Sequence, residues 1–401
     1  MVQISKLAQS VKASATLAAG AKARALRQQG IHVFDFSLGE PDFNTPQHIC
    51  HAATVAMAAG QTHYTPSSGT PELKKAIAAY YARQHGLECG PENIICSNGA
   101  KHSIHNALVT VVGKGDQVII PAPYWVSYSD LVEMAGAKPV LVKCPMKAAF
   151  KMTADQLKKK LTPKTRMLML NSPSNPTGAT YSRQELEALA DVLEPFPDVT
   201  VLSDEIYEHL LYDDHKATCF ATLRPWLKDR TLTISGASKS YAMTGWRLGW
   251  TIGPANVIKA MDNIQSQETS CPGSVTQAAM VVALNSEESP KCIAEMLTEF
   301  TARRAIVTEH LSKIKGVKYS PPDGAFYAFF DVSKHFGKTY GGMAVTDSTS
   351  FCLALLEQAH VNFVPGSAFG LEGFVRMSFA CSRETITGGL DAFKTWMASG
   401  V

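Results

Sequence analysis

The sequence predicts an α/β protein with a mainly parallel sheet, covered by helices on both faces, and a second, smaller α+β domain. Short apolar runs alternate with helical segments between residues 93 and 253, and these runs are apolar at nearly every position. Strands of this kind are buried on both faces, as they are in parallel sheets. After about Glu287 the alternation gives way to a long helical stretch followed by mixed elements. This change predicts the smaller domain.

After an amphipathic N-terminal segment, the sequence predicts a short strand and two helices. A strand-like run over 34–39 leads into a Gly-Glu-Pro turn, and a helix is expected over 46–59. Residues 62–69 are too rich in turn formers for regular structure. Pro71 begins the second helix, because proline is favoured in the first turn of a helix.

A glycine turn joins the next strand to the next helix. The strand covers 93–97, continues through Asn98-Gly99-Ala100, and leads into a helix that ends near residue 112. The free backbone N–H groups at the start of a helix bind anions, so this arrangement predicts a phosphate site.

The rest of the larger domain repeats strand and helix, and its strands should bring their carboxyl ends to one edge of the sheet, where ligands bind in α/β proteins. The predicted strands are 117–120, 140–143, 166–170, 199–203, 231–235 and 247–253, with helices over 124–135 and 182–193.

The smaller domain should begin near residue 288. Its predicted elements are helices over 290–313 and 350–360 and strands over 362–364 and 374–379. We therefore expect a large domain over 46–287 and a small domain over 288–401, to which the N-terminal segment 1–45 also belongs.

Composition excludes several classes of protein. The chain has 401 residues, is 45% hydrophobic, and carries a formal net charge of +3 with scattered basic residues, which argues against nucleic-acid or membrane partners. Nine widely spaced cysteines without a Cys-x-x-Cys pair are typical of a reducing compartment, and we expect a cytoplasmic protein without disulfides or a zinc site. The His102-x-x-His105 pair has no third ligand, so we interpret it as packing and expect no metal.

The residues 235–249 form the first chemical motif. Lys239 follows a predicted strand in a loop of small residues, where a lysine that loses its charge easily can form a Schiff base. Arg247, eight positions later, has the planar fork that suits a phosphate. Pyridoxal phosphate needs an amine for its aldehyde and a cation for its phosphate, and this spacing fits both. Taken alone, this motif leaves open the alternative of a surface lysine and arginine beside a glycine turn.

Four more residues lie where predicted strands end. Asn175 is in Asn-Ser-Pro-Ser-Asn-Pro-Thr-Gly, Asp204 and Tyr207 are in Ser-Asp-Glu-Ile-Tyr-Glu, and Trp125 follows Pro-Ala-Pro-Tyr. Together they offer a pyridine ring a carboxylate for its nitrogen, donors for its oxygen, and an aromatic plate.

These motifs, in this order and spacing, resemble the class I, fold-type I aminotransferases that depend on pyridoxal phosphate, nearest to the bacterial aspartate (aspartate/prephenate) aminotransferase branch. The resemblance covers nearly the whole chain and implies a mixed sheet of the seven-stranded type and a homodimer. It implies that Lys239 is catalytic, since this lysine would hold the cofactor covalently and move a proton from the substrate. Asp204 would pair with the ring nitrogen, Tyr207 and Asn175 would bind the ring oxygen, and Trp125 would stack on the ring.

The resemblance also assigns the remaining site residues. Its implied phosphate ligands are Arg247, Ser238, the N–H groups of Gly99 and Ala100, and Tyr64 from the partner subunit. Many relatives have Ser or Thr where this chain has Gly236, so Ser238 and the backbone would carry more of the phosphate binding. The implied substrate ligands are Arg376 and Gly39 for the α-carboxylate, Lys101 and Thr16 (in Ser14-Ala15-Thr16) for the side-chain carboxylate, and Trp125 and Asn175.

Three functions remain open on the sequence. The first is transfer of an amino group from aspartate or glutamate to 2-oxoglutarate or oxaloacetate by a ping-pong mechanism. The second keeps the cofactor but uses an aromatic, prephenate or alanine-type substrate, or catalyses a β-lyase reaction, because only the side-chain pocket separates these enzymes. The third, a regulator that senses the cofactor without catalysis, is disfavoured because the resemblance begins near residue 1 and leaves no room for a DNA-binding domain.

Overall fold

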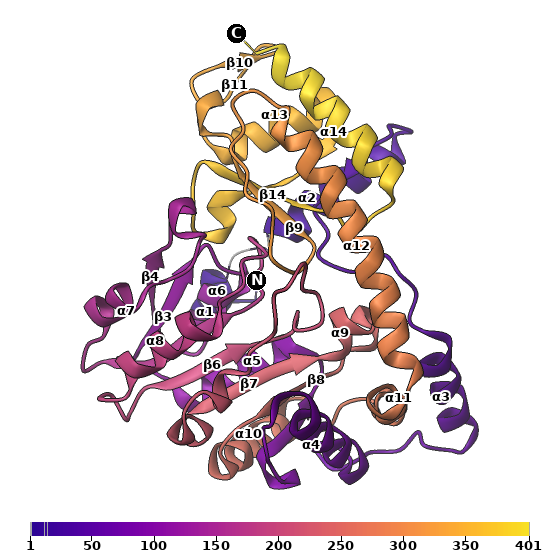
Figure 1. Cartoon of the computed structure of the whole chain (residues 1–401), viewed down its shortest axis with the longest axis vertical. Helices are drawn as coiled ribbons and strands as arrows, with labels where there is room; N and C mark the ends of the chain where they lie inside the picture. Colours follow the sequence, from indigo (N-terminus) through magenta and orange to yellow (C-terminus); the bar gives the residue numbers. More distant parts are fainter. Residues whose placement is uncertain (1, 12, 14, 401) are drawn as a thin grey trace.

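A computed structural model describes residues 2–11, 13 and 15–400 (Figure 1). Its largest sheet has seven strands in the order β2-β8-β7-β6-β5-β3-β4, and only β8 runs antiparallel to its neighbours. The predicted mainly parallel sheet is therefore confirmed. Its strands are β2 (Ile94–Ser97), β3 (Gln117–Ala122), β4 (Lys138–Lys143), β5 (Thr165–Asn171), β6 (Thr200–Asp204), β7 (Thr231–Gly236) and β8 (Gly249–Ile252).

Helices cover both faces of this sheet. Successive side chains of a strand point to opposite faces, and they pack in two different hydrophobic cores. Val118 and Ile120 pack with helices α5 (Ala100–Val111), α6 (Ser127–Met134) and α10 (Ala255–Glu268), whereas Ile119 packs with α7 (Ala154–Lys160) and α8 (Arg183–Leu193). A strand whose two faces are both buried needs apolar residues at every position, which explains the continuous apolar runs. A third core forms between β2, β8 and the helices α3 (Gln47–Ala58), α4 (Pro71–His85) and α11 (Ser274–Asn285).

A smaller group of elements lies above the large sheet in Figure 1. Strand β9 (Tyr327–Asp331) pairs antiparallel with β14 (Phe374–Ser378), which pairs antiparallel with β13 (Val364–Pro365). Strand β1 (Phe34–Asp35) pairs with β12 (Val361–Asn362), so a segment from the first part of the chain joins this C-terminal group. The other elements of this group are α2 (Ala15–Gln28), α13 (Ser348–Ala359), α14 (Arg383–Ala398) and the hairpin of β10 (Thr339–Tyr340) and β11 (Met343–Ala344).

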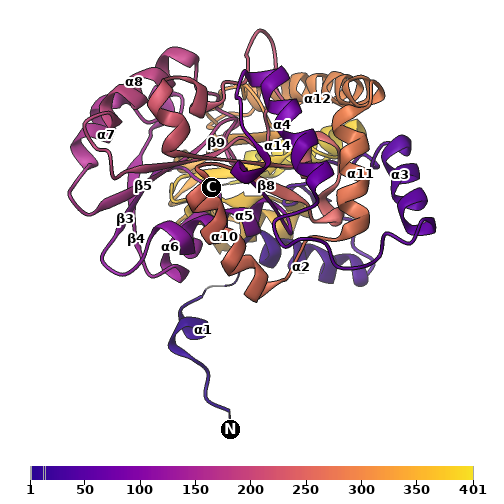
Figure 2. The ribbon, with the colours of Figure 1, turned by 90° about the horizontal axis from the view of Figure 1, so that it is seen from below.

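Helix α12 (Glu288–Ser312) extends from the large sheet up into the smaller group (Figure 1). Seen from below, the N-terminal segment with α1 (Lys6–Ser10) projects away from the rest of the chain (Figure 2). The domain bounds near residues 45 and 287 stay a prediction. Within the described residues, every helix is too short or too polar to cross a membrane.

Two local predictions were wrong. Lys239 lies in a short helix, α9 (Ala237–Ser240), rather than in a loop. The strand β8 begins at Gly249 rather than Arg247, because Arg247 has φ 57° and a left-handed residue cannot continue a strand.

Candidate active site

The predicted site residues converge on one cavity of about 460 Å³ beside the carboxyl ends of the sheet strands. Two predicted residues do not line it: Tyr64, which is 89% exposed, and Gly99, which directly precedes α5. Segments that are more than 300 residues apart thus meet at one place. The predicted residues that line the cavity are Thr16, Gly39, Ala100, Lys101, Trp125, Asn175, Asp204, Tyr207, Ser238, Lys239, Arg247 and Arg376.

Lys239 enters the cavity from α9, directly after β7. Its Nζ donates a hydrogen bond to the carbonyl oxygen of Gly39 at 2.6 Å. Burial lowers the pKa of Lys239 to about 8, although Glu40 opposes this shift. A lysine with such a pKa is partly neutral near physiological pH, and a neutral amine is the form that attacks a carbonyl group.

Asp204 is the last residue of β6 and is only 5% exposed. The hydroxyl of Tyr128 donates to its Oδ2 at 2.5 Å, and the N–H of Ile206 donates to its Oδ1 at 3.4 Å. Burial raises the pKa of Asp204 to about 6 against the effect of these bonds and of Lys239. A buried carboxylate without a bonded cation is stabilised by a positively charged ligand.

Three parts of the chain form an anion site at the start of α5. Gly99 has φ 90°, and a side chain there would collide with the guanidinium of Arg247. Arg247 is exposed to the cavity and donates to the carbonyl oxygen of Thr244 at 2.8 Å. Ser238 lines the same cavity. A helix N-terminus, a guanidinium and a hydroxyl suit a phosphate group.

Arg376 lies on β14 and is buried, with 1% of its surface exposed. It donates to Oδ1 of Asn175 at 3.1 Å and to the carbonyl oxygen of Ser37 at 2.6 Å. Its Nε has no hydrogen-bond partner among the described residues. A buried guanidinium that has only neutral partners and a free N–H suits a carboxylate.

Tyr327, on β9, is a site residue that the sequence analysis missed. Its hydroxyl is 2.8 Å from the hydroxyl of Tyr207, and the guanidinium of Arg376 lies 4.7 Å from its ring centre. Tyr128, which holds Asp204, was missed as well. Neither tyrosine belongs to a local motif, although Tyr128 follows Trp125 by three residues.

Lys101, which was predicted to bind the side-chain carboxylate of the substrate, lines the cavity. Its Nζ is 4.9 Å from the ring centre of Trp125, and Thr16 from α2 lines the same cavity. Burial and, secondarily, Arg247 lower the pKa of Lys101. Ser14, the first residue of the predicted Ser14-Ala15-Thr16 element, lies outside the described residues.

The interpretation of His102 and His105 as packing residues agrees with their contacts. Both imidazoles face the carboxylate of Glu268, at 3.4 and 3.3 Å. Within the part of the chain that the structure describes, no three His, Cys, Asp or Glu residues are grouped as metal ligands would be. All nine cysteines are free thiols, as predicted.

The cavity combines a lysine of lowered pKa with a buried carboxylate, an anion site and a buried arginine. This combination, at the edge of a mainly parallel sheet, indicates a fold-type I transferase of the pyridoxal-phosphate class. Residues 31–393 match the family model "Aminotransferase class I and II". The chain belongs to this aminotransferase family, and it is a transaminase.

Curated relatives and solved structures are similar over nearly the full length. The aspartate aminotransferase of Rhizobium meliloti is 45% identical over 383 residues, which are 95% of this chain and 93% of the relative. The aspartate/prephenate aminotransferase of Nitrosomonas europaea is 44% identical over 387 residues, 96% of this chain and 97% of the relative. The crystal structure of the Rhizobium meliloti aspartate aminotransferase covers 100% of both chains with a TM-score of 0.96 and 44% identity.

The Thermus thermophilus aspartate aminotransferase, solved with maleate, has a TM-score of 0.93 at 39% identity and covers 98% of this chain and 100% of its own. The predicted resemblance is therefore confirmed.

Proposed function

We propose that the protein transfers an amino group from a dicarboxylic amino acid, aspartate or glutamate, to a 2-oxo acid, 2-oxoglutarate or oxaloacetate, by a ping-pong mechanism. The observation that carries this proposal is the pair of cations that line one cavity with Lys239. Arg376 is buried with a free Nε, and Lys101 lies over Trp125. An amino acid with two carboxylates can engage both cations, whereas alanine can engage only one.

The residues of the cavity fit pyridoxal phosphate. Lys239 would hold the cofactor through its amine, Asp204 would pair with the ring nitrogen, and Trp125 would stack on the ring. Tyr207 and Asn175 would bind the ring oxygen. The phosphate would bind to Ser238, Arg247 and the N–H groups of Gly99 and Ala100.

When bound, the cofactor supplies an electron sink for the bond that breaks at the substrate carbon. The chain supplies orientation and proton transfer. Arg376 would fix the α-carboxylate, with the N–H of Gly39 beside it, and Lys101 and Thr16 would bind the second carboxylate. Nζ of Lys239 would then take the proton from the substrate Cα, because its lowered pKa leaves it partly neutral.

The first prediction tests the second cation. Lys101→Ala should lower kcat/KM for aspartate by the equivalent of ~1.5–3 kcal/mol in transition-state free energy, the scale of a hydrogen bond to a charged group. The kcat/KM values for alanine and phenylalanine should stay nearly unchanged. The measurement is a panel of amino donors with 2-oxoglutarate. Lys114→Ala is the matched control, because Lys114 is exposed beyond the other end of the same helix. Equal losses for all donors would remove the dicarboxylate assignment.

A second acceptor merits the same assay. The curated relatives include proteins that are named aspartate/prephenate aminotransferase. Thr16 and Leu17 of α2 line the cavity, and Leu17, which is 66% exposed, offers apolar contact to a ring. Transamination of prephenate with aspartate or glutamate as the donor would extend the proposed function.

The second prediction concerns assembly. We propose a cytoplasmic homodimer in which Tyr64 reaches the phosphate of the partner subunit, since Tyr64 is 89% exposed and does not line the cavity of its own chain. Tyr64→Phe should raise the dissociation constant of the cofactor by about 3- to 10-fold, the loss of one hydrogen bond, in a dialysis assay. Tyr319→Phe is a control, because the hydroxyl of Tyr319 is buried and does not line the cavity. A fully active monomer in sedimentation would refute the dimer.

A further inference from the structure

Helix α12 presents two adjacent arginines to two different segments of the chain. Arg303 contacts the linker 37–46, which descends from β1 to α3. Arg304 contacts the loop 320–326, which descends from the smaller group of elements to the large sheet before β9 begins. We name these segments the linker and the descending loop. One helix therefore fastens both of them.

Arg303 holds the linker through a two-point ion pair. Its Nη1 and Nη2 donate to the two carboxylate oxygens of Asp42 at 2.6 and 2.9 Å. Its Nε donates to Glu299, one turn earlier, at 2.9 Å, and Glu299 also binds Arg383 of α14. Arg303 is only 5% exposed and lies over the ring of Phe43. A buried fork of this kind fixes direction as well as distance.

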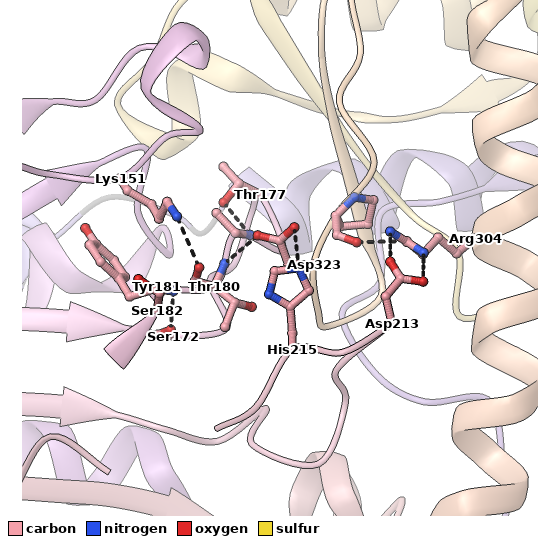
Figure 3. Close-up of polar contacts among 12 residues, drawn as sticks. Lys151, Ser172, Thr177, Thr180, Tyr181, Ser182, Asp213, His215, Arg304 and Asp323 are labelled. Atoms are coloured by element: carbon pink, nitrogen blue, oxygen red, sulfur yellow. Dashed lines mark hydrogen bonds and ion pairs between the residues drawn. The ribbon is translucent and has the colours of Figure 1, made fainter. Parts of the chain in front are cut away.

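Arg304 holds the descending loop in a similar way (Figure 3). Its Nε donates to the carbonyl oxygen of Pro322 at 2.8 Å, and its two Nη atoms bind the carboxylate of Asp213 at 2.9 and 3.3 Å. The guanidinium also lies over the ring of Tyr212. Asp213 belongs to a turn with the composition of a solvated surface, yet it joins the large sheet to α12.

The tip of the descending loop is clamped between two loops of the large sheet. Asp323 accepts a hydrogen bond from the N–H of Thr180 at 3.1 Å, and His215 lies 3.4 Å from the same carboxylate (Figure 3). Gly324 donates to the carbonyl oxygen of Gly178 at 2.8 Å. A side chain at Gly178 would collide with Pro322 and Gly324, so the backbones touch directly.

The two fastened segments meet inside the cavity. A Cβ on Gly39, in the linker, would lie 2.8 Å from the hydroxyl oxygen of Tyr327, which directly follows the descending loop. The carbonyl oxygen of Gly39 accepts from Lys239, and the ring of Tyr327 lies against Arg376. The linker also supplies the carbonyl oxygen of Ser37 to Arg376. The residues that surround Arg376 therefore belong to, or directly follow, the two segments that α12 contacts.

We propose that Arg303 and Arg304 are positioning residues, which fix the contact between Gly39 and Tyr327 and so the shape of the carboxylate pocket at Arg376. The proposal rests on the proposed function only in taking Arg376 as the carboxylate ligand. It assigns a role in substrate binding to residues that touch neither substrate nor cofactor.

The test uses variants of the holoenzyme in which each fastening is weakened without a buried cavity. Asp42→Asn weakens the contact of Arg303 with the linker, and Arg304→Gln weakens the contact of α12 with the descending loop. Asp213→Asn is a gentler variant of the second contact, because the carboxylate of Asp213 is exposed. We expect the dissociation constant of succinate and KM for aspartate to rise about 3- to 10-fold, the effect of one lost hydrogen bond, and kcat to change by less than about twofold. Arg304→Lys should restore part of the binding, because it keeps the charge.

Hydrogen exchange gives a readout that needs no substrate. Residues 37–43 should exchange faster in Asp42→Asn, and residues 320–327 should exchange faster in Arg304→Gln. Arg224→Ala is the matched control, because Arg224 also binds a carboxylate, Asp191, and a backbone carbonyl, that of Leu223, but away from the cavity. It should change neither binding nor exchange in these segments.

The outcomes separate the two proposals. Faster exchange with unchanged succinate binding and KM would overturn the positioning role and leave the arginines as structural residues. Unchanged exchange in all variants would overturn it too. A wild-type enzyme that does not transaminate aspartate would refute the proposed function, whereas the exchange of the linker and the descending loop would still report whether the arginines hold them.

Discussion

Lys239→Ala should lower kcat for transamination by ~10⁴-fold or more, because it removes both the amine that would hold the cofactor and the base that would move the proton. The variant should keep its fold and bind pyridoxal phosphate noncovalently, since Asp204, Arg247 and the helix N-terminus remain. The measurement is single-turnover and steady-state kinetics with aspartate and 2-oxoglutarate. Ethylamine added to the variant should restore part of the activity, which a merely misfolded site would not allow.

The lowered pKa of Lys239 adds a pH test on the wild-type protein. Only the neutral amine reacts with an aldehyde, and burial holds the pKa near 8 rather than its usual 10.5. The rate at which cofactor-free protein combines with pyridoxal phosphate should therefore rise with pH and level off above about 8. A rate that continues to rise to pH 10, or substantial activity in Lys239→Ala, would end the assignment of Lys239.

The residues that the sequence identified are those that stand in local motifs. Lys239 and Asn175 follow strands β7 and β5, and Asp204 is the last residue of β6. The carboxyl ends of these parallel strands meet at one edge of the sheet. Their convergence could be predicted from the strand pattern alone. Arg376 was identified only through the resemblance, because an arginine on a short strand is indistinguishable from a surface residue until the packing of β14 is known.

The residues that the sequence analysis missed are defined by tertiary contacts. Tyr327 lies on the small sheet and reaches Tyr207, 120 positions away, and no spacing rule joins them. The Arg303–Asp42 pair spans 261 positions. Helices α10, α11 and α14 were not predicted either. The apolar residues of α11 are spread over buried and partly buried positions, which blurs its helical periodicity. Helix α14 could have been recognised, because Ile386, Leu390, Phe393 and Met397 recur at helical spacing.

Asp204→Asn should lower kcat by about 10²–10³-fold, because removing one partner of a buried charge pair costs ~3–4 kcal/mol. Asp204 would hold the proton on the ring nitrogen of the bound cofactor, and an asparagine has no charge with which to hold it. Steady-state kinetics at saturating cofactor measure the loss. Glu205→Gln is the matched control: Glu205 is the neighbouring buried carboxylate, but it binds Ser203 and the N–H of Phe220 and does not line the cavity.

The cofactor-free protein supplies an independent test of Asp204. Burial raises the pKa of Asp204 from 3.8 to about 6. Between these two pH values, the folded state therefore binds more protons than the unfolded state. The stability that this group contributes is present below about pH 4 and is lost as the pH rises through 6. In thermal unfolding above pH 6, cofactor-free Asp204→Asn should therefore be at least as stable as cofactor-free wild type, whereas with pyridoxal phosphate bound the wild type should be the more stable. A variant that is less stable than wild type in both forms, with full kcat, would mean that Asp204 serves only the fold.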